Sequence, residues 1–358
     1  MQSNRIEVLD SFRAIAILMV IFFHFFSRWT ALYPYTTSYD FFGYGKYGVH
    51  FFFMISGFVI FFTLEKTTTF KQFWKNRFIR LFPSMFFASV LTYLFFTVFD
   101  TDFLFPTSHY LKNILVSLTF IQPDLISSLT HYRFELDYIS GSYWSLWVEI
   151  QFYFLAATVY YISSKRFYTY FFVIAGILVV ISFLLSHIYS NSFLIIKLKA
   201  LRSIFNLIIA LPFFCLGSIF FIFYKNKVSQ LKNPFFLKAS FVFFIGFLFF
   251  NNYQDVGLLG VILLFVLLFF LMVYYPKSIS FLNNKFLNAV GVSSYFLYLI
   301  HENLGVFLIH KNLLALERFY FLQPIYLILL IIALSVLFTT YIESYVIRFL
   351  KILIKKRQ

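Results

Sequence analysis

Ionisable side chains interrupt an apolar stretch near the N-terminus, LDSFRAIAILMVIFFH (Leu9–His24). Each such group costs about 2.5–3.5 kcal/mol at the centre of a membrane helix, so these residues usually serve a function. Arg13 and His24 are eleven residues apart, which on a helix places both on one side, about 16 Å apart along the axis. Asp10 precedes Arg13 by three residues, within ion-pair range. This polar stripe is a candidate functional site.

The side chains of the stripe suit proton transfer and anion binding. A neutral imidazole at His24 can take a proton from a hydroxyl near neutral pH, as a general base does. The alternative is a histidine that only hydrogen-bonds a neighbouring helix. Arg13 can stabilise developing negative charge or hold a cofactor phosphate, or it can form a structural pair with Asp10. The sequence leaves these alternatives open.

A second polar stripe lies in the apolar run 143–162. Ser145 and Glu149 follow helical spacing there, with Ser142 and Tyr153 on the same side. Glu149 could orient or charge-balance His24, could bind the hydroxyls of a substrate, or could form a structural hydrogen bond between helices. We include Glu149 with His24 and Arg13 among the candidate catalytic residues.

The run 289–309 carries a third polar face. Tyr298 and His301 lie on one side of a helix there, with Ser294, and Glu302 follows directly. His301 is a candidate second polar group for substrate, and Tyr298 and Ser145 are candidates beside it. A histidine packed in a helix bundle is the alternative interpretation.

Two arginines, Arg77 and Arg80, lie at the start of another apolar run, with Lys71 and Lys75 nearby. A spacing of three places both guanidinium groups on one side of a helix end, which suits phosphate groups. The alternative is ordinary membrane anchoring by positive charge.

The composition indicates the elements that position these residues. Of the 358 residues 61% are hydrophobic and only 12% are charged, which excludes a soluble globular domain. The net charge of +15 lies in short loops between apolar runs, so it indicates topology and anionic lipid, not nucleic acid. Cys215 is the only cysteine, which excludes a disulfide within the chain and a thiolate metal cluster. No metal site is expected.

The hydrophobic pattern predicts an all-α, polytopic bundle of about ten transmembrane helices. Counting loops from a cytoplasmic N-terminus places 19 of the 29 Lys and Arg residues on the inner side and 9 on the outer side, so we expect both termini in the cytoplasm. One membrane domain spans 1–358, with a basic cytoplasmic tail at 348–358 and no further C-terminal domain. The expected spans are 9–28, 47–64, 78–99, 143–162, 168–187, 203–224, 236–250, 257–275, 289–309 and 323–347.

Four stretches in this order resemble the acyltransferase-3 family of membrane O-acyltransferases. Arg13 and His24 match its arginine–ten residues–histidine signature. The other stretches are GVHFFFMISGFVI (Gly48–Ile60) followed by FWKNRFIRLFPS with Arg77 and Arg80, SYWSLWVEIQFYFL (Ser142–Leu155) and SSYFLYLIH (Ser293–His301). His50 departs from the pattern, because the family often has an acidic residue there.

The resemblance implies a multi-pass enzyme of the plasma or inner membrane. It would move an acyl group, most simply acetyl, from cytoplasmic acyl-CoA to a hydroxyl of a cell-surface or exported glycan, such as a lipopolysaccharide. His24 would act as general base or carry the acyl group briefly, and Arg77 and Arg80 would bind the phosphates of the donor. Membrane lipids and the glycan acceptor would be its partners. A lipid acceptor is a further possibility, and the alternative function is a transporter or flippase that uses the buried Arg, His and Glu as an ion-coupled relay.

Overall fold

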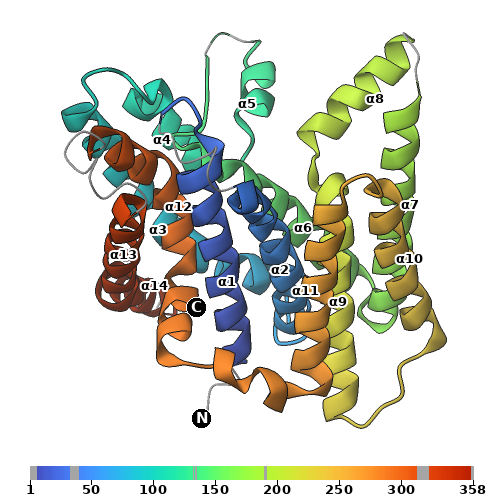
Figure 1. Ribbon diagram of the computed structural model, residues 1–358. Coiled ribbons are helices and arrows are strands. Elements are labelled where there is room, and N and C mark those ends of the chain that lie inside the picture. The colour runs from blue at the N-terminus through green and yellow to red at the C-terminus, as the bar shows by residue number, and fades with distance from the viewer. Residues whose placement is uncertain are drawn as a thin grey trace. The chain divides into compact units, whose positions relative to one another are not determined.

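The apolar runs of the sequence form helices in a computed structural model of the chain (Figure 1). The structure describes residues 6–32, 40–131, 133, 135–188, 192–312 and 322–355. Within these ranges the regular structure is helical, with no strand. A helix satisfies its own backbone hydrogen bonds, as a lipid environment requires. The predicted all-α fold is confirmed.

Eight helical segments of the described chain are long and apolar enough to cross a bilayer. The other two expected spans are also helices, α6 (Trp144–Ile162) and α10 (Phe235–Asn251). Glu149 and Gln151 lower the hydropathy of α6, and the 17 residues of α10 reach only about 25 Å, less than a hydrocarbon core of about 30 Å. The eight segments are Glu7–Arg28, Phe41–Leu64, Phe70–Phe99, Ser164–His187, Leu207–Val228, Val256–Tyr274, Lys285–Asn312 and Leu322–Leu353.

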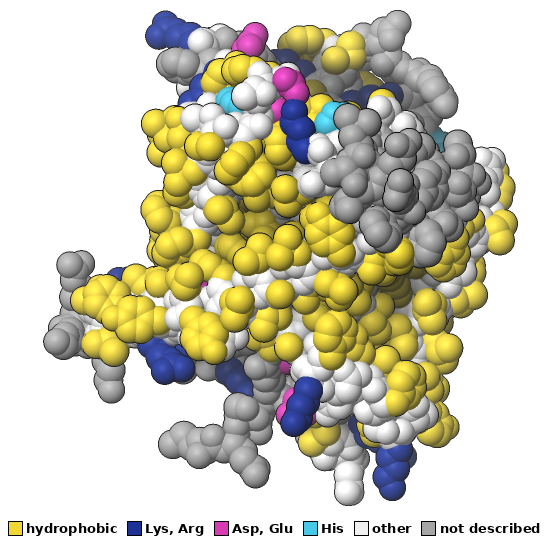
Figure 2. Space-filling model, turned by 60° about the vertical axis from the view of Figure 1, so that its left-hand side comes forward, with side chains coloured by type: hydrophobic (Ala, Val, Ile, Leu, Met, Phe, Trp, Pro, Cys, Tyr) yellow, Lys and Arg dark blue, Asp and Glu magenta, His cyan; other side chains and the backbone are white. Residues whose placement is uncertain are grey.

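The surface agrees with a membrane environment. Hydrophobic side chains cover a broad band of the face shown in Figure 2, and Lys and Arg gather toward its upper and lower ends. Leu329 and Leu334 are among the large apolar residues exposed to the surroundings. The polytopic bundle is thereby confirmed, whereas the side of the membrane on which the termini lie stays a prediction.

The chain separates into two compact units. The first unit comprises Met1–Val49, Lys75–Ser145 and Leu282–Gln358, and the second comprises His50–Trp74 and Leu146–Phe281. The single domain expected from the sequence stays a prediction.

The first unit contains the N-terminal helix and the C-terminal helices. Its elements are α1 (Glu7–Phe23), η1 (His24–Arg28), η2 (Asp40–Tyr47), most of α3 (Phe70–Phe99), η3 (Pro106–His109), α4 (Leu111–Leu118), α5 (Pro123–Leu129), η4 (Gly141–Tyr143), α12 (Lys285–Asn312), α13 (Leu322–Leu337), η8 (Phe338–Glu343) and α14 (Ser344–Lys355).

The second unit contains the central helices of the chain. Its elements are most of α2 (Gly48–Leu64), most of α6, η5 (Ser164–Arg166), α7 (Phe167–His187), α8 (Phe193–Ile204), α9 (Leu207–Val228), α10, α11 (Val256–Tyr274) and most of η6 (Pro276–Leu282). Glycines let α2 and α9 approach closely: a Cβ at Gly57 would lie 2.1 Å from the carbonyl oxygen of Phe214, and one at Gly217 only 1.8 Å from that of Met54. Small residues permit such contacts between membrane helices.

Helices α1 and α12 pack side by side in the first unit and run in the same direction. Glu7 accepts a hydrogen bond from Asn283 at the start of both helices. One turn further, a Cβ at Gly291 would lie 1.8 Å from the carbonyl oxygen of Asp10, and near the other end Gly305 lies against the ring of Phe25. These contacts require glycine, because a larger side chain would displace a neighbouring backbone or ring.

A π-helical turn, His24–Arg28, continues α1. A π-turn inserts an extra residue into the helical ladder, and such turns are frequent at functional sites. The hydrophobic pattern predicts an ordinary helix over this stretch, so the change of hydrogen bonding at His24 is a finding of the structure.

The C-terminal tail was expected as a basic segment and is helical up to Lys355. Arg348, Lys351 and Lys355 recur at helical spacing, whereas Phe349 and Ile352 are exposed apolar residues. This pattern suits a helix that lies in the membrane interface.

We expect Gly291→Ala to destabilise the protein by about 1–3 kcal/mol, because the new methyl group would collide with the Asp10 carbonyl and force α1 and α12 apart. Thermal unfolding of the purified protein in detergent measures this loss. Gly260→Ala in α11 is the matched control, because no atom lies within 4 Å of a Cβ at that position and alanine favours a helix. Equal effects of the two substitutions would contradict the close packing of α1 against α12.

Candidate functional site

His24 lies beside a carboxylate of the neighbouring helix. Its Nδ1 is 3.3 Å from Oε1 of Glu302, and only 13% and 8% of the two side chains are exposed. Helix α1 supplies the histidine at its C-terminal end, and α12 supplies the glutamate. The parallel packing of these helices brings the two residues to the same level.

A second histidine completes this group. The ring of His301 lies 5.0 Å from the ring of His24, edge to face, and its side chain is fully buried. Its Nδ1 is 2.7 Å from the carbonyl oxygen of Tyr298. A carbonyl only accepts hydrogen bonds, so Nδ1 carries the proton and Nε2 of the neutral ring carries the lone pair. Nε2 is buried and has no hydrogen-bond partner among the described residues.

Tyr298 and Ser145 form a group of hydrogen bonds beside His301. The Tyr298 hydroxyl donates to the carbonyl oxygen of Ser142 at 2.8 Å and lies 2.8 Å from the Ser145 hydroxyl. Since the tyrosine proton is engaged with a carbonyl, Ser145 donates to the tyrosine oxygen. The structure therefore brings together four residues that the sequence places on three different helices: His24, His301, Tyr298 and Ser145.

A cavity of about 390 Å³ opens beside this group within the first unit. We name it the His24 cavity; its lining includes His24, Arg28, Trp29, Lys46, Trp144 and Glu302. Its volume lies within the usual range of about 300–1,000 Å³ for small-molecule sites. The lining of the cavity combines a histidine, a carboxylate, cations and aromatic rings, and these groups can bind a polar substrate.

Gly141 and the loop after α3 lie beside the Glu302 carboxylate and form part of the cavity wall. A Cβ at Gly141 would lie 3.1 Å from Oε2 of Glu302, so a larger residue here would press on the carboxylate. The neighbouring Asn303 donates to the Ser108 hydroxyl at 2.9 Å. These contacts tie the loop after α3 to α12.

Asp100 stabilises the loop after α3 through hydrogen bonds to residues of the same loop. Its carboxylate accepts hydrogen bonds from the backbone N–H groups of Leu104 and Phe105, and lies 3.0 Å from Nε2 of His109. Burial raises the pKa of Asp100, but the hydrogen bonds from His109 and the two amides outweigh it and hold the pKa below its usual value. The ionised carboxylate thereby positions Phe105, which also lines the His24 cavity.

The three arginines predicted for anion binding occupy two places in the first unit. Arg13 forms an ion pair with Asp10 at 2.7 Å, the structural pair that the sequence offered as one alternative. Arg77 and Arg80 lie one turn apart near the start of α3, where Arg77 is half-buried and Arg80 is exposed. Neither lines the His24 cavity.

Glu149 belongs to the second unit, where its Oε2 accepts a hydrogen bond of 2.9 Å from the hydroxyl of Tyr153. The carboxylate beside His24 is that of Glu302, a residue that the sequence placed next to His301 without a role of its own. His50 also belongs to the second unit and lies against the ring of Phe213, with 4.4 Å between ring centroids.

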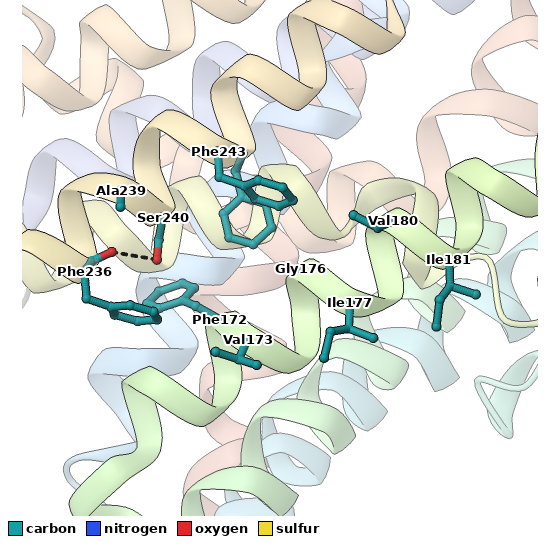
Figure 3. Close-up of a pocket in the computed structure, with 11 residues that line it drawn as sticks. Phe172, Val173, Gly176, Ile177, Val180, Ile181, Phe236, Ala239, Ser240 and Phe243 are labelled. Carbon is teal, nitrogen blue, oxygen red and sulfur yellow. Dashed lines mark hydrogen bonds between the residues drawn. The ribbon is translucent and has the colours of Figure 1, made fainter.

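Two cavities of the second unit have an almost wholly apolar lining. Figure 3 shows a pocket between α7 and α10 in which Ile177 and Phe243 are typical lining residues. The one hydroxyl drawn there, that of Ser240, donates to the carbonyl oxygen of Phe236. Such a surface suits hydrocarbon chains and offers no group for acid–base chemistry. Among the described residues, no cluster of three or more His, Cys, Asp or Glu is placed to hold a metal ion.

Sequence reasoning missed the cavity residues Arg28, Trp29, Lys46 and Gly141. The pairing of His24 with Glu302 could have been suspected, because both are ionisable residues within apolar runs. The cations carried no such signal, because Lys and Arg at the end of a span are ordinary topology determinants.

Comparison with known proteins identifies the family of the chain. The model of the acyltransferase-3 family, described as an acyltransferase domain, matches residues 6–343. Comparisons with curated proteins and with solved structures found no match. Because the match covers nearly the whole chain and includes the paired residues of α1 and α12, the protein belongs to the acyltransferase-3 family and is a multi-pass membrane acyltransferase.

Proposed function

We propose that the protein transfers an acyl group, most simply acetyl, from acyl-CoA to a hydroxyl of a cell-surface or exported glycan, in the plasma or inner membrane. The observation that carries this proposal is that His24 and the neighbouring Glu302 carboxylate line the same cavity. Membership of the acyltransferase family favours this function over the transporter or flippase alternative.

His24 acts as the general base. The Glu302 carboxylate, 3.3 Å from Nδ1, favours the tautomer that carries the proton at Nδ1, which leaves the lone pair of the neutral ring at Nε2. Nε2 takes the proton of the acceptor hydroxyl while its oxygen attacks the thioester carbonyl carbon; the carbon–sulfur bond breaks and the CoA thiolate leaves, taking up that proton. Glu302 is a positioning residue that holds the ring and stabilises the imidazolium, as a buried carboxylate does in other base–carboxylate pairs.

His301 and the groups around it orient the acceptor. The Tyr298 carbonyl holds the tautomer of His301 that leaves a lone pair at Nε2, and this acceptor atom suits a substrate hydroxyl. Ser145 and Tyr298 fix this arrangement through their mutual hydrogen bond. A role of Glu149 in binding acceptor hydroxyls stays a prediction of the sequence.

The donor binds through phosphate contacts at Arg77 and Arg80, at the cytoplasmic end of α3. Guanidinium groups one turn apart match the phosphates of coenzyme A, and the exposure of Arg80 leaves it accessible. Arg13, held by Asp10, supplies positive charge along the side of α1 that leads to His24. Acyl-CoA is the only cofactor proposed, and it is a substrate.

We expect His24→Ala to abolish acyl transfer, because the general base is lost, while the protein still inserts and is stable. Mass spectrometry of the surface glycan compares ester-linked acyl groups in cells with the wild-type and variant proteins. His187→Ala is the control, because His187 is an exposed histidine of the second unit. Equal acyl content with His24→Ala would rule out His24 as the base.

Glu302→Gln removes the charge that orients His24 and stabilises its imidazolium. We expect kcat to fall by about 10²–10⁴-fold, as when a base loses its carboxylate partner. The KM for acyl-CoA should change little, since Glu302 does not bind the donor. Steady-state kinetics of CoA release by the purified protein measures both constants, and an unchanged kcat would contradict the positioning role.

Replacing Arg77 and Arg80 together by alanine should weaken acyl-CoA binding by about tenfold or more, since hydrogen bonds between charged groups contribute about 1.5–3 kcal/mol each. Isothermal titration calorimetry with acetyl-CoA measures the dissociation constant. Lys277→Ala, which removes a positive charge of the second unit, is the control. If the Arg77 and Arg80 double variant binds acetyl-CoA as tightly as the wild type and the Lys277→Ala control, the two arginines serve only to orient the protein in the membrane.

A further inference from the structure

The His24 cavity carries more positive than negative charge. Arg28 lies at the end of the π-turn that begins at His24, and Lys46 lies at the end of η2. Among the residues that the structure describes, Glu302 is the one carboxylate that lines the cavity, and it already faces His24. The charged lining therefore has a surplus of one positive charge with both histidines neutral.

The donors of this cavity lack acceptors. Within the described part of the chain, neither Arg28 nor Lys46 has a carboxylate within 4.0 Å or a hydrogen-bond partner. Both side chains are exposed and lie near the aromatic ring of the residue that follows them, and Arg28 also interacts electrostatically with Glu302. The indole Nε1–H of Trp29 is buried and has no hydrogen-bond partner there either. A buried donor without a partner, such as this indole N–H, is costly, whereas the exposed Arg28 and Lys46 remain accessible to an anion. A bound molecule rich in acceptor oxygens would satisfy them.

Aromatic faces line the same cavity. Trp29 contributes its ring, with Arg28 at 5.7 Å from the ring centroid, and Trp144 is 45% exposed. Flat aromatic rings can hold the apolar C–H face of a sugar ring, while cations and N–H groups bind its oxygens. Cations and aromatic rings in one cavity thus match a sugar that carries an acidic group.

We propose that the His24 cavity binds an acidic sugar, a hexuronate or a sugar phosphate, and that Arg28 and Lys46 hold its carboxylate or phosphate while a hydroxyl faces His24. This specificity rests on the proposed function, since it identifies the sugar as the acceptor. Charge-assisted hydrogen bonds to carboxylate and phosphate are roughly twice as strong as neutral ones. Neutral sugars are accordingly poorer ligands.

The phosphates of acyl-CoA fit this cavity less well. In coenzyme A the extended pantetheine arm separates the diphosphate from the thioester. Phosphates bound at Arg28 and Lys46 would hold the thioester away from His24, which lines the same cavity. The volume of about 390 Å³ also suits a sugar and not the whole donor.

The test uses the full chain in lipid nanodiscs and measures binding of glucuronate, glucose 6-phosphate, glucose and acetyl-CoA by calorimetry. For the wild-type protein we expect the two anionic sugars to bind about tenfold or more tighter than glucose. Arg28→Gln and Lys46→Gln should each reduce that difference and leave acetyl-CoA binding unchanged. Lys112→Gln is the matched control, an exposed lysine of the first unit that lies outside the cavity lining and beside an aromatic ring.

Two results would overturn the inference. The first is that the wild-type protein binds glucose and the two anionic sugars with equal affinity, or binds none of the three. The other is loss of acetyl-CoA binding in Arg28→Gln and Lys46→Gln, which would assign the cavity to the donor. Release of CoA is measured in a separate assay. If anionic sugars bind more tightly than glucose but no acyl group is transferred, the inference stands and the proposed acyltransferase function is contradicted. If the protein transfers acyl groups to glucose and glucuronate equally well, only the inference is contradicted.

Discussion

The site depends on the close packing of α1 against α12. Gly291 lets the backbone of α12 approach the Asp10 carbonyl, and Gly305 receives the ring of Phe25. These two contacts near opposite ends set both the separation and the register of the parallel helices. His24 therefore meets Glu302 and His301 at one level. In lipid, where no hydrophobic effect drives helices together, such backbone-level packing supplies much of the association.

Polar groups inside the bundle form local groups within the first unit. Arg13 is paired with Asp10, Tyr298 with Ser142 and Ser145, and His24 with Glu302. Pairing lowers the cost of burying these groups in an apolar medium. The lining of the His24 cavity adds the buried indole Nε1–H of Trp29, which has no hydrogen-bond partner among the described residues, and this donor is available to a bound molecule.

Much of the fold was predictable from composition and period. Apolar runs long enough to cross a bilayer form helices, as predicted. The helix α8 was missed, because its residues join two apolar runs and carry three basic side chains. The π-turn at His24 was also missed, because a hydrophobic pattern does not distinguish one extra residue in a turn.

The sequence by itself determined the class of the protein, its helices and its family, together with the placement of Arg13 and His24 on one side of a helix. These properties follow from hydrophobicity and from the 3.6-residue period, which act within one segment. Only the tertiary structure decided that Glu302 is the partner of His24, that Glu149 is bonded to Tyr153, and that Arg28 and Lys46 line a cavity with the base. The register between two helices is set by side-chain packing across their interface, which the period of either helix alone does not specify.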